Sequence, residues 1–150
     1  MTTKYSDGEV LMLTYIRSLN EFDRYNTSRC DWLVLNSGKS DHYVVLRPGE
    51  FTTEWIGMST YQITYTTVIE MWQSYTTEAV SYENLYTQLL DPLMGLMAYP
   101  RMGDTSNLVL DSTILYSSEP QFRWTASGNV QWLYWELYVN WKETHTVTIS

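Results

Sequence analysis

The sequence predicts an α+β domain: a mostly antiparallel β-sheet with two helices packed on one face. Two apolar stripes of helical spacing, one near the N-terminus and one in mid-chain, predict the helices. Alternating apolar and polar residues between and after the stripes predict the strands. The predicted order is helix, two strands, one strand, helix, two strands. With 150 residues the chain fits one domain, residues 1–150, that buries a core without disulfides or structural metal.

The first helix is predicted to begin near Ser6 and to end near Asn26. Ser6 and Glu9 have the spacing of a capping box, which satisfies backbone N–H groups at a helix start. The polar residues at 26–28 are turn formers and predict the end of the helix. The apolar stripe comprises Val10, Met12, Leu13, Tyr15, Ile16, Leu19 and Phe22.

The next segments predict a hairpin and then a long strand. Residues 31–36 and 42–47 are short, β-rich runs separated by turn formers. The Pro-Gly pair at 48 and 49 is expected to stop the second run, because proline donates no ladder hydrogen bond. Residues 50–59 then form a connection, and residues 61–71 alternate cleanly between an apolar and a polar face.

The second helix is predicted to begin at Thr77, a plausible N-cap that precedes an acidic first turn. Asp91 and Pro92 interrupt it, which predicts a kink or a restart, because an interior proline breaks a helix. A strand is expected to end at Tyr116, followed by a loop over 117–129. The helical stripe comprises Tyr82, Leu85, Tyr86, Leu89, Leu93 and Leu96.

The closing strand, residues 132–141, has large side chains on both faces. One face carries Leu133 and Trp141, while the other carries Tyr134 together with the polar Glu136 and Asn140. This profile predicts a sheet covered on one side by helices and on the other by a neighbouring chain or a thin aromatic layer. Residues 145–150 form either a further strand or a free arm.

Composition narrows the function. The 9 Lys+Arg against 17 Asp+Glu give a net charge of −8, which disfavours tight nucleic-acid binding. No run of about 18 apolar residues occurs, and no signal peptide is recognised at the start, so a soluble protein made in the cytoplasm is expected. The 13 Tyr and 7 Trp suit either a surface that binds a partner or well-filled strands and core.

No motif indicates catalysis, a cofactor or a metal. His42 and His145 are far apart and share no ligand spacing, and Cys30 lacks a neighbouring base. Carboxylate pairs such as Glu50 with Glu54, or Glu136 with Glu143, arise by chance in an acidic chain. Phosphate-binding glycine motifs and a nucleophile elbow do not occur. The aromatic closing strand fits a core and interface strand better than a base-stacking platform, because few cations flank it.

One family resemblance emerges from the order of the elements. An N-terminal helix, a short strand and turn, the segment HYVVLRPGE at 42–50, a long alternating strand, a mid-chain helix and the closing strand WELYVNW at 135–141 follow one another. This succession resembles the tail terminator, or tail completion, proteins of long-tailed bacteriophages over nearly the whole chain. The resemblance implies a virion protein of the tail rather than an enzyme.

The resemblance further implies a ring, usually a homohexamer, on the head-proximal end of the tail tube. Such a ring stops tube polymerisation, contacts the tail tube protein and presents a surface to the head or neck connector protein. DNA passes through without specific binding, which we expect acidic residues lining the hole to assist. Two alternatives remain: a neck adaptor, or a small acidic ligand-binding or enzymatic α+β domain with an apolar pocket.

The two long connections carry the candidate contact residues, because loops commonly carry partner contacts. Each residue either contacts a partner or packs locally to anchor its own loop. The candidates are Phe51, Trp55 and Met58 in the first connection and Phe122, Arg123 and Trp124 in the second.

Overall fold

The computed structural model describes residues 5–19, 22, 26–29, 40–95, 113–117, 119–124 and 131–147, and it confirms the α+β class. The predicted strand at 31–36 and Cys30 lie outside these ranges. In chain order the elements are α1 (Tyr5–Arg17), β1 (Thr27–Arg29), β2 (His42–Trp55), β3 (Thr60–Ser74), α2 (Glu78–Asn84), the π-helical η2 (Leu85–Leu90), α3 (Asp91–Met94), β4 (Thr113–Ser117), β5 (Gln121–Trp124) and β6 (Gln131–Thr146).

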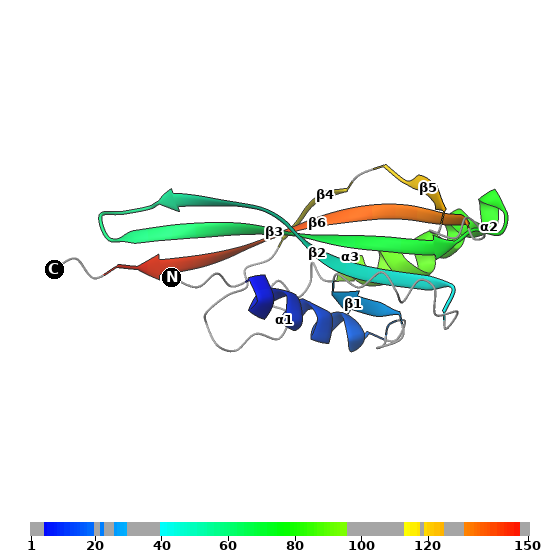
Figure 1. The fold of residues 1–150 in the computed structure, drawn as a ribbon, viewed down its shortest axis with the longest axis horizontal. Coiled ribbons are helices and arrows are strands. Elements are labelled where there is room, and N and C mark those ends of the chain that lie inside the picture. Colours follow the sequence, from blue (N-terminus) through cyan, green and yellow to red (C-terminus); the bar gives the residue numbers. More distant parts are fainter. Residues whose placement is uncertain are drawn as a thin grey trace.

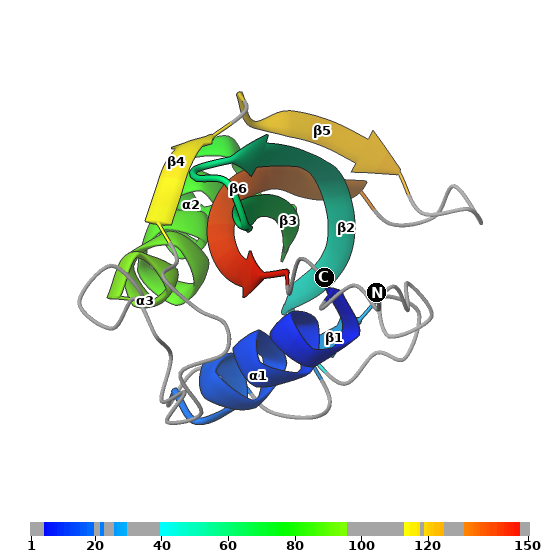
Figure 2. The same cartoon turned by 90° about the vertical axis from the view of Figure 1, so that its left-hand side faces the viewer.

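One mixed sheet organises the described residues. Its strand order is β1-β2-β3-β6-β4, and β5 also pairs with β6. Only the short β1 pairs in parallel, with β2; the other pairings are antiparallel. The long strands β2, β3 and β6 run along the length of the molecule (Figure 1), and the sheet curls strongly when viewed from its end (Figure 2).

Both helical segments pack on one face of the sheet, as predicted. Met12 and Ile16 of α1 and Leu89 of η2 are fully buried in a single cluster with the strands. Burying such large apolar side chains supplies most of the driving force for docking the helices. The cluster is completed by Phe22, Val44, Leu46, Ile63, Tyr65, Ile69, Met71, Leu85, Leu93, Leu133, Leu137, Val139 and Trp141.

A second, smaller cluster fills the opposite face at one end of the sheet. Tyr43 meets Trp132 edge to face at 5.5 Å between ring centroids, and Trp72 meets Tyr134 in the same way at 4.5 Å. With Val45 these side chains are at most 8% exposed. Of the two coverings predicted for the second face, the thin aromatic layer is therefore present here.

The N-terminal helix is shorter than predicted. It ends at Arg17, not near Asn26, and Arg17 donates a hydrogen bond to the Thr27 carbonyl oxygen at 2.6 Å. The expected polar turn at 26–28 instead leads into β1. The expected capping box is also wrong, because Ser6 lies inside α1 and the buried Glu9 carboxylate accepts a hydrogen bond from Arg29 at 3.1 Å.

The mid-chain helix begins as predicted, with Thr77 in the N-cap position. It restarts at the Asp91-Pro92 interruption through the π-helical η2. The Asp91 N–H bonds to the Tyr86 carbonyl five residues earlier, and the following proline has no N–H to donate. The widened turn lets the chain continue helically, so the buried stripe of Leu85, Leu89 and Leu93 is kept.

Three strand boundaries differ from the sequence prediction. β2 continues past Pro48 to Trp55, so residues 50–59 are not a connection but the outer part of a hairpin with β3. The predicted loop over 117–129 contains β5. His145 lies in β6, which extends the closing strand to Thr146.

Candidate interaction surface

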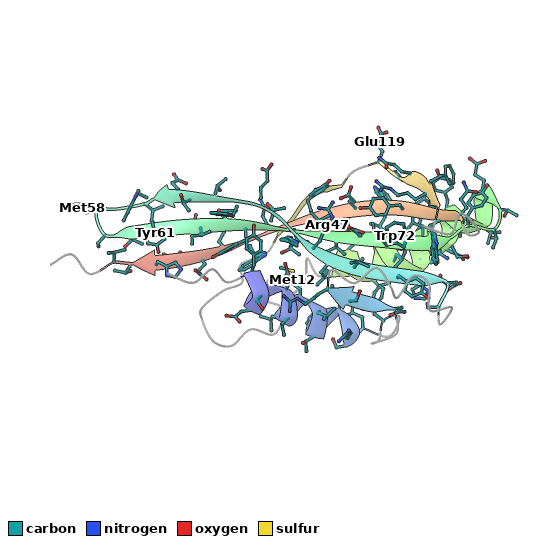
Figure 3. All side chains as sticks on the ribbon, in the orientation of Figure 1. Met12, Arg47, Met58, Tyr61, Trp72 and Glu119 are labelled. Carbon is teal, nitrogen blue, oxygen red and sulfur yellow. The ribbon has the colours of Figure 1, made fainter. Side chains whose placement is uncertain are left out.

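Beyond the helices the three long strands continue as an extension that we call the arm, residues 51–66 and 140–147. Within it Phe51 pairs with Tyr65, and Tyr65 pairs with Trp141. The arm projects to one side of the molecule with Met58 at its tip (Figures 1 and 3). Its length follows from the hairpin between β2 and β3.

A bulge lets β2 pass the Pro-Gly pair and enter the arm. The register with β3 shifts between Pro48 and Phe51, and a bulge is one of the few places where a sheet tolerates proline. A Cβ on Gly49 would lie 3.0 Å from the Thr66 carbonyl oxygen, so glycine permits the close approach of the two strands. The bulge therefore absorbs the residues that were expected to end the strand.

The tip of the arm is held by backbone hydrogen bonds. The Ile56 N–H donates to the Thr60 carbonyl oxygen at 2.9 Å, which closes the turn between β2 and β3. The Val147 N–H donates to the Ser59 carbonyl oxygen at 2.7 Å, which attaches the end of β6 to the same turn. All three strands are thus paired to the tip.

The arm has two chemically different faces, because side chains alternate along each strand. The same register places aromatic residues of all three strands on one side and hydroxyl, amide and charged residues on the other. The aromatic face comprises Phe51, Thr53, Trp55, Tyr61, Ile63, Tyr65, Trp141, Glu143 and His145. The polar face comprises Thr52, Glu54, Gln62, Thr64, Thr66, Asn140, Lys142, Thr144 and Thr146.

At its base the aromatic face continues the helix-covered core. Tyr65 stacks on Trp141 at 4.2 Å, and Tyr5 of α1 meets Tyr65 edge to face at 4.8 Å. The Tyr5 hydroxyl donates to the Gly49 carbonyl oxygen at 2.8 Å. Burial raises the pKa of Tyr5, with further contributions from Tyr65 and the Glu9 and Glu50 charges, so the phenol stays protonated and keeps donating.

Towards the tip the aromatic face opens to solvent. Trp55 meets Tyr61 at 5.3 Å, and Tyr61 stacks on His145 at 5.2 Å. His145 in turn contacts the carboxylate of the buried Glu143. Trp55 is 63% exposed and Met58 is 93% exposed. An open depression of about 200 Å³ lies beside this group, lined by Thr53, Glu54, Trp55 and Tyr61.

The part of the sheet that is covered on both faces, by the helices on one and by the aromatic layer on the other, we call the two-sided half. A charged cluster around Arg47 lies where the arm meets the two-sided half (Figure 3). Arg47 donates a hydrogen bond to Glu70 at 2.7 Å and contacts Glu136. Trp72 Nε1 donates to the other oxygen of Glu70 at 3.0 Å. Arg123 of β5 lies over the Tyr134 ring at 4.3 Å from its centroid, a cation–π contact.

Protonation states in this cluster follow from its surroundings. Burial raises the pKa of Tyr134, and the Glu70 and Glu136 charges raise it further. Burial lowers the pKa of Arg47, but hydrogen bonds with Tyr134 and Glu70 and the charge of Glu136 outweigh this and raise it. The cluster therefore holds a neutral phenol and a charged guanidinium, with the arginine linking β2 to β3 and β6.

The structure separates the six candidate contact residues into two groups. Phe51, Trp55 and Met58 lie together on the arm, where Phe51 is 55% exposed. Phe122, Arg123 and Trp124 lie on β5, at the other end of the molecule (Figure 1). Phe122 contacts Tyr75 edge to face at 5.3 Å and is 46% exposed, so it packs locally while keeping open surface.

Two residues on or beside this surface were not among the six candidates. Ile56 is 54% exposed at the hairpin turn, and the clean alternation that begins at Tyr61 was the signal for a strand continuing to the tip. Arg47 was not singled out, although it is the lone cation in its run and falls on the face that carries Glu136. Pairing it with Glu70 and Glu136 required the register of three strands.

The two histidines and the carboxylate pair considered in the sequence can be placed in the described residues. The described residues contain no group of three or more His, Cys, Asp or Glu side chains placed to hold a metal ion. His42 lies 2.8 Å from the Asp41 carboxylate on the edge of β2, and His145 pairs with Glu143 on the arm. Glu136 and Glu143 fall on opposite faces of β6 and so form no pair.

Neither a protein-family model nor a curated protein sequence matches the chain. Within the described ranges, no helix has the length and apolar character needed to cross a bilayer.

Proposed function

We propose that this protein is a structural subunit of a bacteriophage tail. Copies form a ring, six-membered in the family that the sequence resembles, on the head-proximal end of the tail tube. The ring stops tube polymerisation and presents the surface to which the head or neck connector attaches. No covalent chemistry is part of this role.

The arm is the observation that carries the proposal. It presents Phe51, Trp55, Ile56 and Met58, all more than half exposed, along one strand and its turn. Contiguous exposed apolar surface on a folded domain commonly marks a site of protein association. Tryptophan and tyrosine are also among the residue types that most often dominate the binding energy of an interface. An extended arm suits a subunit that must contact the next subunit of a ring or the tail tube.

The charge of the chain is compatible with a DNA passage. A net charge of −8 repels phosphate, which favours sliding over retention where acidic side chains face the hole. Acidic residues of the arm that are exposed, such as Glu54, are available for such a surface. A ring whose lumen is basic would contradict this part of the proposal.

Tube capping gives the direct test. The purified protein is added to polymerising tail tube protein of the same phage, and tube lengths are measured by negative-stain electron microscopy. We expect shorter tubes with extra density at one end, and a Trp55→Ala, Met58→Ala variant that caps poorly. Unchanged tube lengths, with the protein unbound, would contradict the terminator role.

The same samples separate a neck adaptor from a terminator. An adaptor binds the head connector protein but leaves tube length unchanged, whereas a terminator shortens tubes. Asp91→Asn, at an exposed position of α3 outside the arm, is the control and should cap tubes as the wild type does.

A further inference from the structure

A buried carboxylate lies on the aromatic face of the arm. Glu143 of β6 is on the same side of the sheet as Trp141, and Ile63 of β3 lies directly opposite it. Both neighbours are buried, and the Glu143 side chain is 1% exposed. Burying a carboxylate among apolar side chains costs free energy unless a partner compensates it. An acid at a position where the strand pattern favours an apolar residue is the kind of local conflict that often marks a functional role.

The Glu143 carboxylate fixes the orientation of an imidazole ring. His145 lies two residues further along the same face, and its Nε2 contacts Oε1 of Glu143. Because a carboxylate only accepts hydrogen bonds, Nε2 carries the hydrogen and donates it. The imidazole ring stacks on Tyr61 of β3, with 5.2 Å between the ring centroids and 18° between the ring planes. The buried acid therefore holds a ring that supports Tyr61.

Tyr61 connects this pair to the open surface. It lies near the tip of the arm (Figure 3) and meets Trp55 edge to face at 5.3 Å. Trp55 is 63% exposed, and both rings line the open depression of the arm. The contacts thus run from a buried carboxylate, through two stacked rings, to an exposed tryptophan, and they link β6, β3 and β2.

Stability is a poor explanation for the buried acid. The second carboxylate oxygen of Glu143, Oε2, has no hydrogen-bond partner among the described residues. Replacing a buried charge and its partner by apolar side chains of similar volume is often neutral or even stabilising. Orientation is a better explanation, because a ring that is already ordered loses less conformational freedom when a partner binds.

We propose that Glu143 and His145 position the exposed aromatic rings of the arm for contact with a partner. Glu143 holds His145, His145 supports Tyr61, and the Trp55 ring is thereby ordered before binding. Neither member of the pair needs to contact the partner for this role. The inference rests on the proposed function, in which the arm contacts the next subunit or the tail tube.

Ring contacts in the free protein test the positioning. Nuclear Overhauser effects between the Trp55 and Tyr61 rings are measured by NMR, with the Trp55 signals assigned by their loss in Trp55→Phe. Glu143→Leu removes the buried charge and releases the imidazole. We expect the effects to weaken in this variant while the urea midpoint stays at or above the wild-type value. Glu143→Gln keeps an oxygen that accepts from His145 and should preserve both.

Tube capping tests the consequence for binding. The protein concentration that halves the mean tube length should rise about fivefold in Glu143→Leu, because the rings must then be ordered on binding. Glu143→Gln should cap as the wild type does. Glu9→Leu is the matched control, because the Glu9 side chain is 5% exposed and pairs with Arg29 outside the arm. It removes a buried carboxylate in the same way and should leave capping unchanged.

Four results would overturn the positioning role. They are ring contacts that persist in Glu143→Leu, a urea midpoint that falls in Glu143→Leu but not in Glu9→Leu, capping that is unchanged although the ring contacts are lost, and a Glu143→Gln variant that behaves like Glu143→Leu. A wild type that leaves tubes uncapped refutes the proposed function instead. The ring contacts and urea midpoints of the free protein then still decide whether Glu143 orders Trp55.

Discussion

The two ends of the long β3 strand differ in what covers them. From Thr67 to Gln73 every residue is buried, regardless of the face on which it lies. From Tyr61 to Thr66 only Ile63 and Tyr65 are buried, and the residues between them are not. The first part lies between the helices and the aromatic layer, whereas the second part belongs to the arm, whose polar face remains accessible.

The difference lies in the chemistry of the second face rather than in strand geometry. In the two-sided half that face carries Tyr43, Trp72 and Tyr134, which bury one another. In the arm the equivalent positions carry Gln62, Thr64 and other polar or charged residues. A sheet covered on both faces stabilises the fold, while one left open on a face keeps surface for partners.

Removing the cation at the boundary of the two halves should have the largest effect. The Glu70 and Glu136 side chains are 4% and 13% exposed, so Arg47→Ala leaves two nearly buried carboxylates without their cation. We expect a loss of about 3 kcal/mol in the free energy of unfolding, because removing one partner of a buried ion pair leaves the other charge buried and uncompensated. Urea unfolding followed by tryptophan fluorescence measures it.

Lys142→Ala is the matched control on the arm, because Lys142 is exposed. It should shift the unfolding free energy by no more than about 0.5 kcal/mol. Equal effects of the two variants would mean that the halves do not differ in electrostatic burial.

A smaller loss is expected where α1 docks at the base of the arm. A Cβ on Gly8 would lie 2.5 Å from the ring of the fully buried Trp141, so Gly8→Ala must displace the helix or the ring. Overpacking of this kind costs about 1–3 kcal/mol. Thermal unfolding by circular dichroism measures the loss, and Gly57→Ala, with open space around the added methyl, should leave stability nearly unchanged.

The sequence predicted the features that depend on local pattern. The strand at 61–71, the closing strand and the buried leucines of the second helix follow from period-two and helical signals, and each is confirmed. The predicted exposure of the polar face of the first strand holds only as far as Thr66, because every residue from Thr67 to Gln73 is buried. The leucine stripe of the second helix stays buried through the π-helical turn, because Leu85 and Leu89 still face the sheet.

Features that depend on distant partners were not predicted. Pro48 reads as a strand end, but the bulge against Thr66 carries β2 onward, and nothing near Pro48 in sequence signals it. β1 is a short strand with polar residues, stabilised by pairing with β2 and by Arg17. The six interface candidates were chosen as loop residues, and most prove to be strand residues, because both presumed loops are paired.

Alkaline pH should weaken the two-sided half. The folded-state pKa of Tyr134 is raised, so its phenol ionises first in the unfolded chain. The neutral phenol contributes fully to the free energy of unfolding below its pKa in the unfolded chain, which is about 10. That contribution is lost as the pH rises from there towards the higher pKa in the folded protein, by about 1.4 kcal/mol per pH unit. Tyr134→Phe should flatten the fall in urea midpoint above about pH 10 relative to the wild type. An identical fall in both proteins would contradict it.

Trp55→Ala should have the smallest effect on stability. It should also separate the roles of the two halves most clearly, because it should weaken association while leaving the fold intact. Trp55 is 63% exposed and meets the Tyr61 ring edge to face, so truncating it removes little buried surface. We expect the free energy of unfolding to change by no more than about 0.5 kcal/mol. A tryptophan that anchors an interface is worth about 2 kcal/mol, so association or tube capping should weaken about thirtyfold in the same variant. Loss of stability with association intact would assign Trp55 to the fold instead and would remove the arm's open aromatic face from the interaction surface.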